Sequence, residues 1–96
     1  MKEHSSWLTP GEMERLAIIA EECGEVVQAV GKIIRHGYES DFVGPTNREQ
    51  LEKELGDVLY AINLMAKKKD INLSRVQESS EQKAEKIKPY LHHQEG

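Results

Sequence analysis

Two long stretches of the chain repeat apolar residues every three or four positions, and each opens with the same short start signal. The first opens with TPGE at residues 9–12 and the second with TNRE at residues 46–49. A threonine followed three residues later by a glutamate forms a capping box at a helix start, and proline is favoured at the first helical position. The pattern predicts two long amphipathic helices, from residue 9 to about 36 and from 46 to about 69.

The remaining boundaries come from weaker signals. Gly37 suits the position just after the first helix, and three lysines at 67–69 favour the negative end of the second helix dipole. The segment 38–45 holds two aromatic residues, a glycine and a proline, and predicts a loop. A third helix is expected from about residue 72 or 74 to 88, because Pro89 favours a stop nearby.

These elements predict an all-α protein with three main helices per chain. The 96 residues form a single domain, residues 1–96, with an N-terminal arm over 1–8 and a frayed tail over 92–96. Only 5% of residues are aromatic, so the core depends on aliphatic side chains. Three helices leave one side of such a core uncovered, and a small domain buries little surface. We therefore expect a four-helix-bundle-like core completed in a homodimer or homotetramer.

Charge and composition exclude several classes of partner. The net charge is −4 and the basic residues are scattered, so we expect no nucleic acid polymer as partner. No apolar run reaches about 18 residues, and no signal peptide is expected, so we expect no membrane partner. The single cysteine fits a reducing cytoplasm, and Cys23 itself lies on the apolar arc, where we expect a small buried hydrophobe.

Two pairs of acidic residues stand three positions apart, one pair on each long helix. The pairs are Glu22 with Glu25 and Glu54 with Asp57. Residues with this spacing share one face of a helix. Rotating each helix by about 100° per residue puts both pairs at the edge of its apolar arc. Acids that only solvate a helix are expected opposite that arc, so a solvating role is the weaker interpretation.

Acids at the facing edges of two helices about 8–10 Å apart would converge on one point. Four converging carboxylates repel one another unless a cation lies among them. Mg²⁺ prefers oxygen ligands, whereas zinc prefers histidine and cysteine. The sequence therefore predicts a Mg²⁺ site, with Mn²⁺ as a possible substitute.

The two acidic motifs resemble the signature of a known family. Glu-Glu-x-x-Glu at 21–25 and Glu-x-x-Asp at 54–57 are similar to those of the MazG-like all-α NTP pyrophosphohydrolase superfamily, and the resemblance runs from about residue 13 to 65 and loosely to 86. It implies that the four acids bind Mg²⁺ and that an NTP or dNTP is hydrolysed to the monophosphate and pyrophosphate. It also implies that Glu21 binds a further metal or orients the attacking water.

Three lysines are candidates for binding the phosphates. Lys32 lies two turns beyond Glu25 on the same face and either contacts a phosphate or is solvated. The resemblance implies a basic residue on the last helix, where Lys83 and Lys86 share a face. An asparagine often found one turn before that lysine in the family is replaced here by serine. Three aromatic side chains could stack on a nucleobase, although local packing or subunit contact is the more common role: Trp7, Tyr38 and Phe42.

Three other functions remain open. The first is a phosphoribosyl-ATP pyrophosphohydrolase-like enzyme of the same superfamily. The second is a non-enzymatic helical module that binds metal or a partner. The third is a carboxylate-bridged di-iron or di-manganese protein, which usually places histidine three residues after a glutamate, where this chain has Glu25 and Asp57. Pyrophosphate release from a panel of nucleotides would separate the enzyme from the module.

Overall fold

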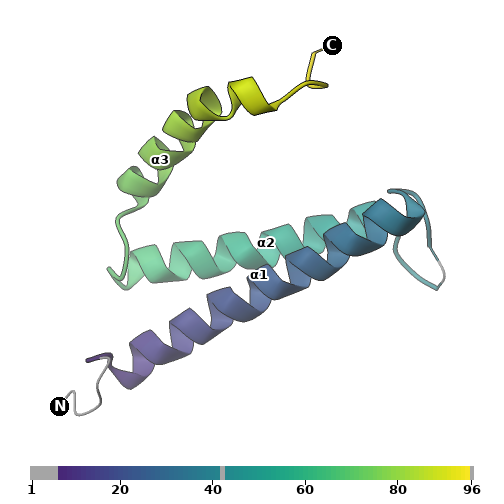
Figure 1. Ribbon diagram of the computed structural model, residues 1–96. Helices are drawn as coiled ribbons and strands as arrows, with labels where there is room; N and C mark the ends of the chain where they lie inside the picture. The colour runs from purple at the N-terminus through teal and green to yellow at the C-terminus, as the bar shows by residue number, and fades with distance from the viewer. Residues whose placement is uncertain (1–6, 42, 96) are drawn as a thin grey trace.

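The computed structural model describes residues 7–41 and 43–95, which form three α-helices and a short 3-10 helix (Figure 1). The helices are α1 (Pro10–His36), α2 (Asn47–Lys67) and α3 (Leu73–Lys86), and the 3-10 helix is η1 (Lys88–Tyr90). No strand occurs within the described ranges. The prediction of an all-α chain with three main helices is confirmed.

Both predicted capping boxes are present. The backbone N–H of Glu12 donates to Thr9 Oγ1 at 3.1 Å, and the N–H of Thr9 donates back to Glu12 Oε1 at 2.7 Å. Thr46 and Glu49 make the same pair of bonds, at 3.1 and 2.9 Å. Each box satisfies donors that the first helical turn would otherwise leave without partners. The starts of α1 and α2 are therefore the ones that the sequence predicted.

The helix ends follow the predictions less closely. Gly37 ends α1 with φ 88° and ψ 167°, a region that side-chain-bearing residues avoid, and its N–H donates to the Ile33 carbonyl at 2.7 Å. Asn72 rather than Ser74 caps α3, since its Oδ1 accepts from the Arg75 N–H at 3.2 Å. The helix ends at Lys86, two residues before the predicted stop, and the chain passes through Pro89 as η1.

The first two helices form an antiparallel hairpin, and α3 leads away from it (Figure 1). The open end of the hairpin is joined by a two-pronged ion pair, in which Arg15 Nε and Nη2 donate to the two oxygens of Asp70 at 2.5 and 3.0 Å. The radius of gyration is 17.1 Å, whereas a compact globule of this length has about 12.5 Å. A single chain is thus an extended object rather than a closed bundle.

The hydrophobic core of one chain is very small. Of the described residues, three hydrophobic side chains are buried, Ala29, Ala61 and Met65. Cys23, predicted to face the core, is exposed. The prediction was wrong because α2 packs on the side of α1 that carries Ala29, and Cys23, six residues away, points about 120° from it.

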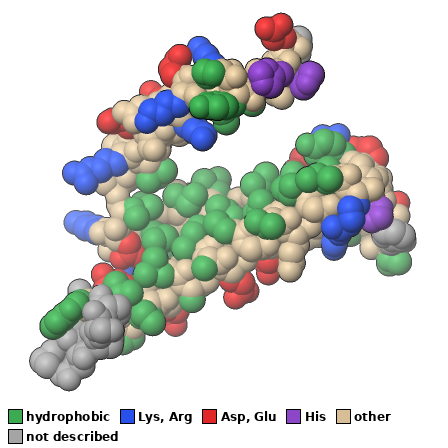
Figure 2. Space-filling model, in the orientation of Figure 1, with side chains coloured by type: hydrophobic (Ala, Val, Ile, Leu, Met, Phe, Trp, Pro, Cys, Tyr) green, Lys and Arg blue, Asp and Glu red, His purple; other side chains and the backbone are tan. Residues whose placement is uncertain are grey.

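Large hydrophobic side chains instead gather on the outside of the hairpin. Figure 2 shows them along the hairpin face that is turned toward α3. At about 100° per residue, six exposed hydrophobic side chains lie on one side of α1 and α2. We call this surface the apolar band, and it comprises Leu16, Val27, Val30 and Ile34 of α1 with Leu55 and Leu59 of α2, all exposed.

The outer segments add little to this hairpin. Residues 1–6 of the predicted arm, Phe42 of the loop and Gly96 of the tail lie outside the described residues. Trp7 is exposed, and Tyr38 is covered on one ring face by the Arg48 guanidinium, 4.4 Å from the ring centroid. Within the described ranges, no helix combines the length and the hydrophobicity needed to cross a membrane.

Candidate metal centre

The four acids of the two spaced pairs come together between α1 and α2. Glu22 and Glu25 approach from α1, and Glu54 and Asp57 from α2. One carboxylate oxygen of each lies within 4.8 Å of the corresponding oxygens of the other three. The convergence arises because each pair shares one helix face and the two faces meet in the hairpin.

How deeply each acid is buried follows from the number of residues that separate it from the buried alanine of its helix, because this number sets the angle between the two side chains. Glu22 lies seven residues before Ala29, and Glu54 lies seven before Ala61, so both point into the α1–α2 contact, about 20° from the alanine. Glu54 is 8% exposed. The prediction that the acids lie at the edge of the apolar arc needs a correction: these two lie in the middle of the contact, because the contact is rotated away from that arc.

The remaining charged residues of the site are shallower. Glu25 and Asp57 lie four residues before the same alanines, about 40° round the helix, and the Asp57 side chain is 37% exposed. Glu21 and Lys53 lie eight residues before the alanines, about 80° round, and both are exposed. Glu21 and Lys53 therefore form the two rims of the site.

The electrostatics of the deep acids are unfavourable. Glu22 Oε2 is buried and has no hydrogen-bond partner among the described residues. Burial, followed by the charge of Asp57, raises the pKa of Glu22. Contact with Glu54 and repulsion by Glu22 raise the pKa of Glu25. The cluster thus concentrates negative charge that the protein itself only partly neutralises.

Two residues that the sequence analysis missed contact the acids. Lys53 Nζ lies 2.9 Å from Asp57 Oδ2 and 3.5 Å from Glu54 Oε1, and it lowers the pKa of Asp57. Gln50 Nε2 donates to Glu54 Oε2 at 2.9 Å. Each lies four residues before the acid that it contacts most closely, so the i,i+4 spacing was a signal that could have identified both.

The donor set fits a hard divalent ion. Two oxygens bound to one octahedral Mg²⁺ stand about 3.0 Å apart in cis and about 4.2 Å apart in trans, given metal–oxygen distances of about 2.1 Å. The 4.8 Å limit of the cluster is within a small side-chain adjustment of that range. The buried oxygen of Glu22, which has no hydrogen-bond partner among the described residues, would be available to such an ion without breaking a hydrogen bond. The cluster contains carboxylates alone, which favours Mg²⁺ or Mn²⁺ over zinc.

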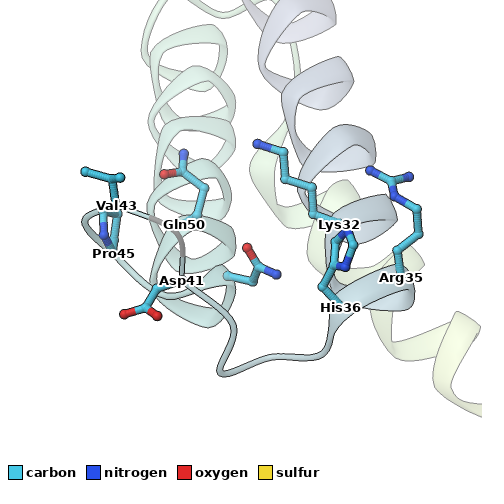
Figure 3. A pocket seen from close by; sticks show the side chains of 8 residues that line it. Lys32, Arg35, His36, Asp41, Val43, Pro45 and Gln50 are labelled. Carbon is cyan, nitrogen blue, oxygen red and sulfur yellow. The ribbon is translucent and has the colours of Figure 1, made fainter.

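A pocket of about 310 Å³ lies at the closed end of the hairpin, where the loop joins α1 to α2 (Figure 3). Lys32 lines it with Arg35 and His36 from α1, and Gln50 lines it from α2. Lys32 and Gln50 extend from the two helices on either side of the space. Since Gln50 also donates to Glu54, this pocket is next to the carboxylates.

The other predicted residues are not brought to the acids within the chain. Lys83 and Lys86 are exposed on α3, which packs chiefly with η1 rather than with the hairpin. Glu21 is near the cluster but on its exposed rim.

Comparison with known proteins agrees with this geometry. The model of the MazG nucleotide pyrophosphohydrolase domain matches residues 11–92, which include the hairpin, all four acids and α3. No curated protein and no solved structure matches the chain. Because the family match extends over most of the sequence, from the first turn of α1 to beyond η1, the chain belongs to the MazG nucleotide pyrophosphohydrolase domain family.

Proposed function

We propose that this protein is a Mg²⁺-dependent nucleoside triphosphate pyrophosphohydrolase that converts an NTP or dNTP to the monophosphate and pyrophosphate. The observation that carries the proposal is the convergence of four carboxylates, one with a buried and unpartnered oxygen, in a chain of this family. Without a bound metal ion, the four carboxylates repel one another and also repel a triphosphate. A bound divalent ion offsets this negative charge, so that the site attracts the triphosphate.

Glu22, Glu25, Glu54 and Asp57 are the proposed ligands of Mg²⁺, or of Mn²⁺ in its place. The bound ion supplies positive charge for the triphosphate and for the pyrophosphate leaving group. In the reaction, a water oxygen bonds to the α-phosphorus while the bond from that phosphorus to the bridging oxygen breaks. Glu21, exposed on the rim beside the ligands, is the proposed residue that orients this water and accepts its proton.

The phosphates need donors in addition to the ion. Lys32 is a candidate because its pocket is next to the carboxylates through Gln50. Lys83 and Lys86 lie on α3, away from the hairpin of their own chain. We propose that they reach the acids of another subunit in a homodimer or homotetramer, in which the apolar band is covered.

The test is pyrophosphate release from a panel of nucleotides in the presence of Mg²⁺, using the wild type, Glu54→Gln and Asp57→Asn. Each substitution keeps the size of the side chain but removes one charge from the ligand set. We expect a loss of roughly hundredfold or more in turnover, since removing even an outer partner of a metal ligand costs about 10–100-fold. Glu52→Gln, an exposed acid on the same helix, is the matched control and should change turnover little.

The competing functions give different results in the same assay. Normal turnover in the Glu54 and Asp57 variants would contradict the proposed site. A wild type that releases pyrophosphate from no nucleotide would favour a non-enzymatic metal-binding module. Release from phosphoribosyl-ATP alone would assign the chain to that branch of the superfamily. A carboxylate-bridged iron or manganese centre would show itself by bound redox-active metal in the purified protein.

A further inference from the structure

The ligand positions of the site repeat with the same spacing on the two helices. Relative to Ala29 on α1 and Ala61 on α2, ligand positions recur at minus seven and minus four on both helices. The position at minus eight is Glu21 on α1 but Lys53 on α2. The rim of the site is therefore acidic on α1, where Glu21 lies, and basic on α2, where Lys53 lies.

Within the described part of the chain, the ammonium of Lys53 is the positive group that contacts these carboxylates. It lies 2.9 Å from Asp57 Oδ2 and 3.5 Å from Glu54 Oε1, so it contacts one oxygen of each of two proposed metal ligands. An ammonium and a divalent ion that contact the same carboxylates repel each other, because both are positive and lie a few ångströms apart. Binding of a divalent ion by Asp57 and Glu54 is therefore opposed by Lys53 until its ammonium moves away.

Lys53 is able to move. Its side chain is 62% exposed, on a flexible four-carbon stem at the rim, and the pair with Asp57 is one that solvent screens. A displaced ammonium remains at the mouth of the site, across from Glu21. A triphosphate bound to the ion would present anionic oxygens to it there.

We propose that Lys53 is a displaceable counter-ion, which neutralises Asp57 and Glu54 in the metal-free protein and, when the divalent ion displaces it, binds the leaving pyrophosphate end of the nucleotide. This inference rests on the proposed function, because it assumes that the carboxylates bind a divalent ion. It assigns Lys53 a substrate-binding role that links metal binding to phosphate binding. The simpler alternative is an i,i+4 ion pair that only supports α2.

Metal binding alone tests the first half. Calorimetric titration with Mg²⁺ and with Mn²⁺, without nucleotide and at low ionic strength, would compare the wild type with Lys53→Met, which keeps the stem and loses the charge. We expect Lys53→Met to bind the ion about fivefold more tightly, the factor that corresponds to one strong exposed ion pair. Lys53→Arg, which keeps the charge, and Lys67→Met, an exposed lysine on the same helix, should stay within about twofold of the wild type.

Phosphate binding tests the second half. The probe is inorganic pyrophosphate, titrated into protein that is saturated with Mg²⁺. We expect Lys53→Met to bind pyrophosphate about fivefold more weakly than the wild type, and Lys53→Arg to retain most of the affinity. Metal and pyrophosphate affinities that move in opposite directions are a result that a purely structural ion pair would not produce.

The outcomes separate this inference from the proposed function. A wild type that binds neither Mg²⁺ nor Mn²⁺ overturns the metal site and the proposed function with it. If the wild type and Lys53→Met bind the ion with equal affinity, the counter-ion role of Lys53 is overturned and the proposed function is not. Tighter metal binding with unchanged pyrophosphate binding overturns the phosphate role of Lys53.

Discussion

Individual side chains in this protein bring negative charge to the middle of a helix–helix contact. Glu54 is more deeply buried than most apolar residues of the same hairpin. Glu22 also points into the contact and ends in an oxygen without a partner among the described residues. Buried charge of one sign opposes folding unless it is compensated. The residues that serve the proposed function are therefore expected to reduce the stability of the metal-free protein.

Glu22→Gln should raise the stability of the metal-free protein and remove metal stabilisation. The amide keeps the size of the side chain, removes one of four mutually repelling charges, and can donate to a neighbouring carboxylate. Thermal unfolding in EDTA should shift upward by a few degrees, whereas the shift that Mg²⁺ gives the wild type should be lost. Glu14→Gln, an exposed acid on the same helix, should change neither value. A lower melting temperature for Glu22→Gln in EDTA would contradict this account of the site.

The sequence predicts the ends of the helices better than it predicts which of their faces pack together. Capping boxes and glycines act through neighbouring residues, so the starts of α1 and α2 and the end of α1 were predictable. The side of α1 that α2 covers was not. The apolar arc is wider than one helix contact, so periodicity alone does not specify which part of it the second helix covers. That is why Cys23 is exposed and Glu54 buried, although the i,i+3 spacing correctly indicated that the acids converge.

Two glycines of the hairpin should respond in opposite ways to alanine. At Gly56, within α2, an added Cβ meets no atom within 4 Å among the described residues, so Gly56→Ala should stabilise by about 0.5–1 kcal/mol through helix propensity. Gly37 has φ 88°, so Gly37→Ala should destabilise by about 1–3 kcal/mol. Urea unfolding measures both. A loss of stability at Gly56 would mean that another subunit packs against this part of α2.

The ion pair that closes the open end of the hairpin should make stability depend on acid pH. The Arg15 guanidinium lowers the pKa of Asp70 below its ordinary value. A lowered carboxyl pKa stabilises the fold above the ordinary pKa of about 3.9, and the contribution is lost as pH falls through the lowered value. The difference in unfolding free energy between wild type and Asp70→Asn should thus be constant from pH 7 to 5 and shrink toward pH 3.

The control for that pH series is an exposed ion pair in the same hairpin. Glu39 and Arg48 form one at 2.7 Å, with side chains 72% and 52% exposed. Such pairs contribute little, so Glu39→Gln should change stability only slightly at every pH. If the Asp70→Asn difference persisted unchanged at pH 3, the Arg15 pair would not be the source of the acid sensitivity.

The whole molecule is extended, and it has few buried residues for its dimensions. It measures 50 × 38 × 22 Å, has three buried hydrophobic side chains among the described residues, and carries an apolar band along one side of the hairpin. Contiguous exposed apolar surface of this kind marks an interaction site. The all-α class was predictable from periodicity. The separation of α3 from the hairpin was not, because no local signal specifies which surface a helix packs against.

Adjacent residues of α1 provide a test of how the apolar band is covered. Val27 belongs to the band and Gln28 lies about 100° away from it, and both are exposed in the single chain. In an isolated chain, Val27→Glu and Gln28→Glu should each change stability by less than about 0.5 kcal/mol. If a second copy covers the band, light scattering of the wild type should give two or four times 10.9 kDa. Val27→Glu should then lower that mass and the melting temperature, because a buried unpaired charge opposes association, whereas Gln28→Glu should leave the mass unchanged. A wild type of 10.9 kDa at micromolar concentration would contradict the assembly, and with it the route by which Lys83 and Lys86 are proposed to reach the acids.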